Sequence, residues 1–121
     1  MVQLRPGNPL YHALLAEVYA QQGLLEQALA EAEEALLVSR GSAAYHDLLG
    51  QILLALGRPG EAVAEAEEAV RLKPTMVSYQ VNLAEAYEVA GRCEEAIAAY
   101  ERVLELDPQN ATATKWLRQL R

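Results

Sequence analysis

Residues 30–35 read Ala-Glu-Ala-Glu-Glu-Ala, and the same six residues return in the same order at 64–69. The two copies lie 34 residues apart, which makes the chain a candidate for an internal repeat of that period. Sliding the sequence by 34 aligns Gly23, Gly57 and Gly91; Leu15, Leu49, Leu83 and Leu117; Tyr11, Tyr45 and Tyr79; Ala28, Ala62 and Ala96; and Pro6, Pro74 and Pro108. Chance explains matches of alanine and glutamate, but it is a poor explanation for glycine, tyrosine and proline in register together.

Each repeat has the apolar spacing of two helices. In the middle repeat, the positions i, i+3, i+4 and i+7 of the first helix are Leu49, Ile52, Leu53 and Leu56. This spacing places apolar side chains on one helical face. Gly57 is then expected to end the helix in a left-handed conformation. Pro59 suits the first turn of a second helix, and Pro74 ends that helix because the residue before a proline leaves the helical region.

The register divides the chain into units and predicts how each begins. We expect helix–turn–helix units at 9–42, 43–76 and 77–110 and a final helix at 111–120, all within one domain of residues 1–121. Asn8, Ser42 and Asn110 stand where a helix needs an N-cap side chain, and Thr75 is the expected cap in the third unit.

Composition narrows the class of protein. The 121 residues are 52% hydrophobic by count, contain no phenylalanine and carry a formal net charge of −7. This mixture favours an all-helical fold, and the apolar runs are too short for membrane insertion. Acidity disfavours nucleic acid and anionic membrane surfaces as partners, since both are polyanions. The single cysteine, Cys93, suits a reducing compartment, so we expect a cytoplasmic protein in which this side chain is partly buried.

The pattern resembles the tetratricopeptide repeat family, whose 34-residue units have a leucine–glycine pair, small residues at the turn and an alanine-rich second helix ending in proline. In the middle unit the matching residues are His46, Leu49, Gly50, Gly57, Ala62, Ala69 and Pro74. The place of His46 is that of a large residue in the family, and His12, His46 and Gln80 fill it where tryptophan is often found. The resemblance implies a right-handed α-solenoid of three repeats with a C-terminal capping helix. It also implies a non-catalytic scaffold for protein–protein interaction.

By the same resemblance, the first helices line a concave groove that holds a partner peptide or helix. The groove residues that follow from the register are Leu10, Ala13, Glu17, Asp47, Gln51, Leu54, Val81, Glu85, Glu88 and Lys115. Their mixed apolar and acidic character suits a peptide with aliphatic anchors and some basic residues. The alternative is that they are ordinary solvated helix positions.

Two further interpretations concern partners. The first unit is rich in leucine for an end of the array, which makes it a candidate surface for self-association, unless the chain is part of a longer array. Family members that hold the acidic C-terminal tail of heat-shock chaperones use lysine, arginine and asparagine in the groove. Here the corresponding places hold Ala13, Glu17, Leu48, Ser78 and Asn82. Because Glu17 and Glu85 would repel such a tail, we expect no clamp of that kind.

The sequence offers little for catalysis. His12 and His46 lie one repeat apart, too far to share a metal ion, and no third ligand is evident, so a packing role is favoured. The paired glutamates recur with the repeat and are interpreted as a solvated face. No phosphate-binding loop, serine elbow or zinc-protease motif is present. We therefore expect neither an enzyme nor a metal or other cofactor.

Overall fold

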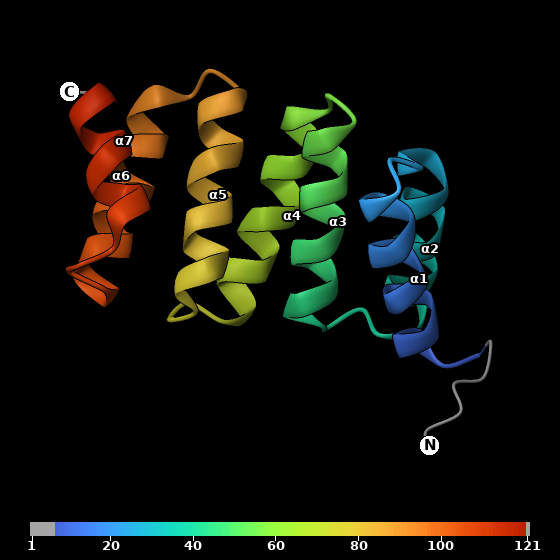
Figure 1. Ribbon diagram of the computed structural model, residues 1–121. Helices are drawn as coiled ribbons and strands as arrows, with labels where there is room; N and C mark the ends of the chain where they lie inside the picture. The colour runs from blue at the N-terminus through green and yellow to red at the C-terminus, as the bar shows by residue number, and fades with distance from the viewer. Residues whose placement is uncertain (1–6, 121) are drawn as a thin grey trace.

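The computed structural model describes residues 7–120, which form three helical hairpins followed by a single helix, with no strand among them (Figure 1). The helices are α1 (Pro9–Gln21), α2 (Leu25–Val38), α3 (Ala43–Ala55), α4 (Pro59–Leu72), α5 (Val77–Val89), α6 (Cys93–Leu106) and α7 (Ala111–Leu120). The first helices of successive units begin 34 residues apart, so the period of the sequence is the period of the structure. None of the helices over residues 7–120 is long and apolar enough to cross a membrane.

The turn inside each hairpin is built as the glycine spacing predicts. Gly23, Gly57 and Gly91 have φ angles of 79°, 78° and 79°, the left-handed region that glycine adopts without strain. In the middle hairpin the Gly57 amide donates to the Leu54 carbonyl at 3.1 Å, and the Arg58 amide donates to the Leu53 carbonyl at 2.9 Å. This pair of bonds satisfies the last carbonyls of α3 and directs the chain into α4.

Three of the four predicted N-caps form. Asn8 accepts from the Leu10 amide at 2.9 Å, Ser42 from the Tyr45 amide at 3.2 Å, and Asn110 from the Ala113 amide at 3.0 Å. The prediction of Thr75 was wrong. Met76 precedes α5, and no side chain caps that helix. Met76 lies 34 residues after Ser42, so it occupies the N-cap position that the repeat predicts. The Thr75 hydroxyl lies one residue before that position.

Small residues allow the two helices of each hairpin to approach closely. A Cβ atom on Gly50 would lie 3.4 Å from the Ala62 carbonyl oxygen of α4, and the counterparts Ala16 and Ala84 are fully buried. One apolar core continues through the described chain, from Ala16 to Leu117 of α7. At the C-terminal end the Trp116 ring stacks on Tyr100, with ring centroids 6.5 Å apart. Helix α7 therefore covers the third hairpin, as expected of a capping helix.

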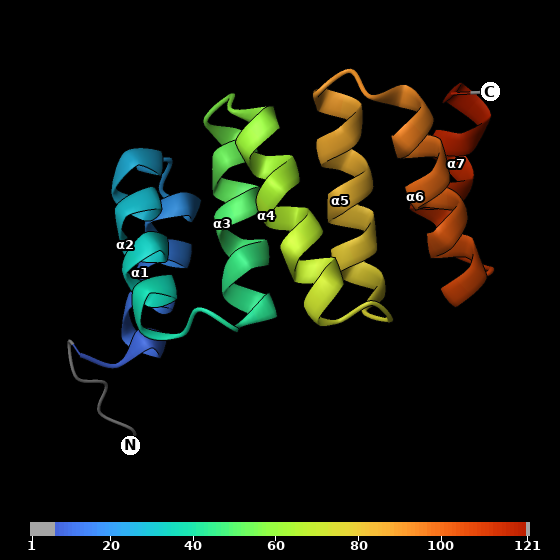
Figure 2. The ribbon, with the colours of Figure 1, turned by 180° about the vertical axis from the view of Figure 1, so that it is seen from behind.

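The helices form two layers. In Figures 1 and 2 the first helices α1, α3 and α5 lie on one side of the molecule, and the second helices α2, α4 and α6 lie on the other. We call these sides the first-helix face and the second-helix face. The groove residues predicted on α1, α3 and α5 therefore belong to the first-helix layer.

Two side chains are more exposed than expected. By the register, Val18 of α1 takes the place that Ile52 holds in the apolar stripe of the middle repeat, yet Val18 is 47% exposed, whereas Ile52 and Ala86 at that place are buried. Helices α3 and α5 each contact a preceding hairpin, and α1 has no described hairpin on that side. Cys93, the first residue of α6, was expected to be partly buried but is exposed.

Candidate functional site

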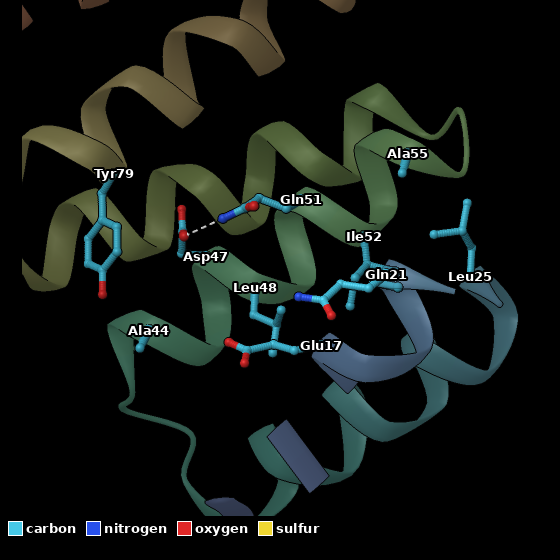
Figure 3. Close-up of a pocket in the computed structure, with 11 residues that line it drawn as sticks. Glu17, Gln21, Leu25, Ala44, Asp47, Leu48, Gln51, Ile52, Ala55 and Tyr79 are labelled. Carbon is cyan, nitrogen blue, oxygen red and sulfur yellow. Dashed lines mark hydrogen bonds between the residues drawn. The ribbon is translucent and has the colours of Figure 1, made fainter. Parts of the chain in front are cut away.

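A cleft of about 610 Å³ lies between α1 and α3 on the first-helix face (Figure 3). This volume is in the range of about 300–1,000 Å³ that is typical of ligand sites. Figure 3 shows Glu17 and Gln21 on one side of this space, with Asp47, Leu48 and Gln51 on the other. The lining residues are Glu17, Ala20, Gln21, Leu25, Ala44, Asp47, Leu48, Gln51, Ile52, Ala55 and Tyr79. We call this space the α1–α3 cleft.

The repeat shows why this cleft is open. One unit further along the chain, a cavity of only about 20 Å³ lies among residues of α3, α4 and α5. Leu54 of α3 lines that smaller cavity, and its counterpart on α1 is Ala20. The smaller side chain of alanine at this place agrees with the larger volume of the α1–α3 cleft.

Asp47 is the buried polar group of the α1–α3 cleft. It is only 8% exposed, and each of its carboxylate oxygens has an amide donor: Gln51 Nε2 donates to Oδ2 at 2.7 Å and Asn82 Nδ2 donates to Oδ1 at 2.9 Å. Burial raises the pKa of Asp47, and the two amide donors oppose that rise. Since Asn82 belongs to α5, the same contacts tie the second hairpin to the third.

Further carboxylates surround this position. Glu17 is exposed on α1, and Glu85 and Glu88 are half-buried on α5. Burial raises the pKa of Glu85, and the charge of Glu88 adds to that rise. The Tyr100 hydroxyl donates to Glu88 at 3.3 Å. This side of the molecule therefore carries several carboxylates in partly desolvated surroundings.

The glutamates of α4 and α6 differ from these carboxylates in their ion pairs. Four of them form ion pairs with arginine three residues away: Glu61 with Arg58, Glu68 with Arg71, Glu95 with Arg92, and Glu105 with Arg102. Within residues 7–120, Glu17, Asp47, Glu85 and Glu88 have no such cationic partner. The ion pairs thus neutralise part of the acidity of the second-helix layer, whereas these four carboxylates of the first-helix face have no counter-charge within the described part of the chain.

The structure places the predicted groove residues unevenly. Glu17, Asp47 and Gln51 line the α1–α3 cleft. Leu54 and Glu85 line the smaller cavity, together with Asp47 and Gln51. The residues that line neither space are Leu10, Ala13, Val81, Glu88 and Lys115. Ala13 is buried and offers little contact area, and the Lys115 ammonium lies 5.9 Å from the centroid of the Trp116 ring.

Leu25 and Tyr79 also line the cleft and were not among the predicted groove residues. The buried ring of Tyr79 packs with Ala43 and Ala69. Burial raises the pKa of Tyr79, and the charge of Asp47, which lines the same cleft, adds to that rise. Leu25 is the first residue of α2, and its counterparts in the other units are Pro59 and Cys93. A comparison between units could therefore have shown that the first unit alone has a large aliphatic side chain at this place.

The histidines have a defined structural role. His12 Nδ1 lies 2.5 Å from Glu31 Oε2, and His46 Nδ1 lies 2.7 Å from Glu65 Oε2. The first contact joins α1 to α2, and the second joins α3 to α4. Across the part of the chain described, no three histidine, cysteine or acidic side chains are placed to hold a metal ion.

Comparison with family models gives two matches. A tetratricopeptide repeat model matches residues 48–111, and a second model of the same description matches residues 1–52. No curated protein matches the chain.

Solved structures share the fold. The chain is similar to the first TPR of Spaghetti (RPAP3) bound to HSP90 peptide SRMEEVD, with a TM-score of 0.89 and 22% identity over 99% of this chain and 95% of that one. It is also similar to the second TPR domain of human RPAP3 in complex with HSP70 peptide SGPTIEEVD, with a TM-score of 0.84 and 20% identity over 93% and 98% of the two chains. MamA matches with a TM-score of 0.84 and 22% identity over 95% of this chain and 72% of that one. At these identities the likeness shows the fold.

Proposed function

The chain belongs to the tetratricopeptide repeat family, and from that premise we propose that it is a non-catalytic protein-interaction scaffold that binds a partner peptide or helix along its first-helix face. The observation that carries the proposal is the α1–α3 cleft, which is open and lined by both apolar and acidic side chains. The proposed contacts are Leu10, Glu17, Asp47, Gln51, Leu54, Val81, Glu85, Glu88 and Lys115. Ala13 is left out because it is buried.

The chemistry of this face indicates the kind of partner. Leu48 and Leu25 offer apolar surface in the cleft, and Asp47 and Glu17 offer negative charge. A peptide with aliphatic anchors and basic residues is complementary to both features.

A cytoplasmic location suits a protein whose single cysteine, Cys93, is exposed.

The scaffold presents these groups with little reordering. Asp47 is fixed by amide donors from α3 and α5, and a continuous core holds the hairpins together. A receptor that is already ordered loses less entropy when the partner docks. Rigid presentation of a binding face is the mechanism that we propose, and no chemical step is part of it.

The similar structures support peptide binding as a use of this fold. Two of them hold peptides that end in Glu-Glu-Val-Asp, as their descriptions state. In this chain the face bears Glu17 and Glu85, so the proposed partner has the opposite charge.

The proposal is tested with peptides selected from a displayed random library on the immobilised chain. Their affinity is then measured by fluorescence anisotropy against the wild type and a groove variant, Glu85→Lys with Glu88→Lys. A matched control, Glu33→Lys with Glu34→Lys, makes the same charge change on exposed positions of α2. We expect the groove variant alone to lose binding, by about tenfold or more. Equal losses in both variants, or a library that yields no binder, would contradict the proposal.

A second candidate function is homo-oligomeric assembly through the first hairpin. Leu10, Leu14 and Val18 are 45%, 41% and 47% exposed and recur every four residues along α1, so they form one apolar stripe. This candidate predicts a molar mass that rises with concentration in light scattering, and a return to the monomer mass when Leu14 is changed to Gln. A monomer at high concentration would remove it and leave the peptide-binding function.

A further inference from the structure

We infer that the α1–α3 cleft receives an arginine side chain of the partner, with the guanidinium group on Asp47 and the aliphatic stem beside Leu48. The inference rests on the proposed function and names the side chain that this particular cleft recognises. It concerns one place in the stack, between the first and second hairpins.

The cleft combines the two surfaces that an arginine side chain presents. Leu48 lines the cleft together with Glu17 and Asp47 (Figure 3), so the cleft offers apolar surface as well as carboxylate groups. Long cationic side chains bury their methylene stems on apolar surface and keep the charged end on polar groups. A purely apolar partner side chain would leave both carboxylates unmatched.

Among residues 7–120, no positively charged side chain forms an ion pair with Asp47. Its carboxylate is 8% exposed, and its partners are the neutral amides of Gln51 and Asn82. A buried carboxylate without a cation is unfavourable, and burial accordingly raises the pKa of Asp47. A cation that enters the cleft offsets this desolvation, so binding energy is available at this point.

The geometry favours arginine over lysine. One amide donor on each oxygen fixes the plane of the Asp47 carboxylate and leaves each oxygen able to accept a second bond. The planar fork of a guanidinium group matches two parallel acceptors, whereas an ammonium group is a point charge without that fit. Glu17, on the opposite wall, adds a second acidic group.

The repeat restricts the site to one interval. Ala20 leaves the cleft open, and its counterpart Leu54 lines a cavity of only about 20 Å³ in the next interval. An Ala20→Leu variant therefore places the larger side chain of the next interval in the α1–α3 cleft without changing any charge.

The test is an NMR titration of the full ¹⁵N-labelled chain with N-acetyl-arginine methylamide. The matched probe is the citrulline analogue, which has nearly the same shape and no charge, and the lysine analogue is a third. We expect the arginine probe to shift the side-chain amide signals of Gln51 and Asn82 in a saturable way. The lysine probe should bind more weakly, and the citrulline probe about tenfold more weakly or not at all.

Variants locate the effect. Asp47→Asn should remove the saturable response, and Ala20→Leu should reduce it. Glu17→Gln, at an exposed position that tolerates change, should weaken it by about two- to fivefold, which keeps the test informative should Asp47→Asn fail to fold. Glu68→Gln, on a glutamate already paired with Arg71, should leave it unchanged.

The inference is overturned if arginine and citrulline give equal responses, if neither gives any, or if the response survives in Asp47→Asn. The proposed function has a separate outcome. Arginine is replaced by citrulline in the library-selected peptides. If these peptides still bind the first-helix face equally well, the scaffold function stands and the arginine site is refuted.

Discussion

At the residue scale, the contacts of His46 show what histidine contributes to the hairpin. Its Nδ1 atom lies 2.7 Å from Glu65 Oε2, and its Nε2 atom lies 2.9 Å from the Arg40 carbonyl oxygen. In the third unit Gln80 takes the same place, and its Nε2 donates to the Pro74 carbonyl at 3.0 Å. Glutamine thus reproduces the carbonyl contact, and the third unit has Ala99 at the place of Glu65, so no carboxylate is there for a second contact.

This comparison predicts the order of two substitutions. His46→Gln should lower the free energy of unfolding by about 1 kcal/mol, because one side-chain hydrogen bond is lost. His46→Ala should lower it further, because both contacts and part of the packing are lost. Urea denaturation followed by circular dichroism measures both. Equal losses in the two variants would show that the carbonyl contact contributes nothing.

Glu85 gives a prediction on pH. Burial and the charge of Glu88 raise its pKa above the usual 4.5, so the folded state holds the proton more tightly than the unfolded state does. The stability linked to this group is therefore present below pH 4.5 and is lost as the pH rises through the raised value. Glu85→Gln should stabilise the protein at pH 7 by about 0.2–0.5 kcal/mol and have little effect at pH 4.

Thermal unfolding at the two pH values measures the effect, and Glu34→Gln, at an exposed position on α2, is the control. A stabilisation of the same size at both pH values would contradict the explanation from titration. The expected gain also means that this carboxylate lowers the stability of the fold, as is common for groups that serve a binding site.

At the element scale, the α3–α4 turn has one glycine whose backbone conformation requires glycine and a second whose conformation does not. Gly57 has a φ of 78°, and Gly60 lies in the first turn of α4 with open space where a Cβ atom would go. Gly57→Ala should destabilise the protein by about 1 kcal/mol because of the left-handed backbone. Gly60→Ala should stabilise it by about 0.5 kcal/mol through helix propensity. Denaturant midpoints measure both, and a shared sign would refute this assignment of the turn.

The elements were largely predictable from the sequence, because their signals are local. Gly57 and Pro59 mark the turn and the start of α4 within three residues of each other, and the structure agrees. The prediction of Thr75 failed because a favourable side chain was preferred over the repeat register, which places Met76 at the cap.

The site was less predictable, because it depends on contacts between units. Asp47 was chosen as a groove residue, but its burial and its bond to Asn82, 35 residues further on, appear only in the folded stack. The open cleft depends on Ala20, whose small size carries no signal until its counterpart Leu54 is compared.

At the scale of the whole molecule, the carboxylates of the first-helix face predict how this chain responds to acidic peptides. The peptide SRMEEVD, which the description of one of them names, is a direct probe. We predict no saturable binding to this chain, because Glu17 and Glu85 stand on the first-helix face and like charges repel. Isothermal titration calorimetry measures the interaction. Micromolar binding would show that the chain holds acidic tails and that our interpretation of its charge is wrong.

The central claim, that partners dock on the first-helix face, is tested most directly by an amide chemical-shift map of the ¹⁵N-labelled chain with a library-selected peptide. The account predicts that the largest shifts fall on α1, α3 and α5, centred on the residues around Asp47. Shifts concentrated on α2, α4 and α6 would contradict it.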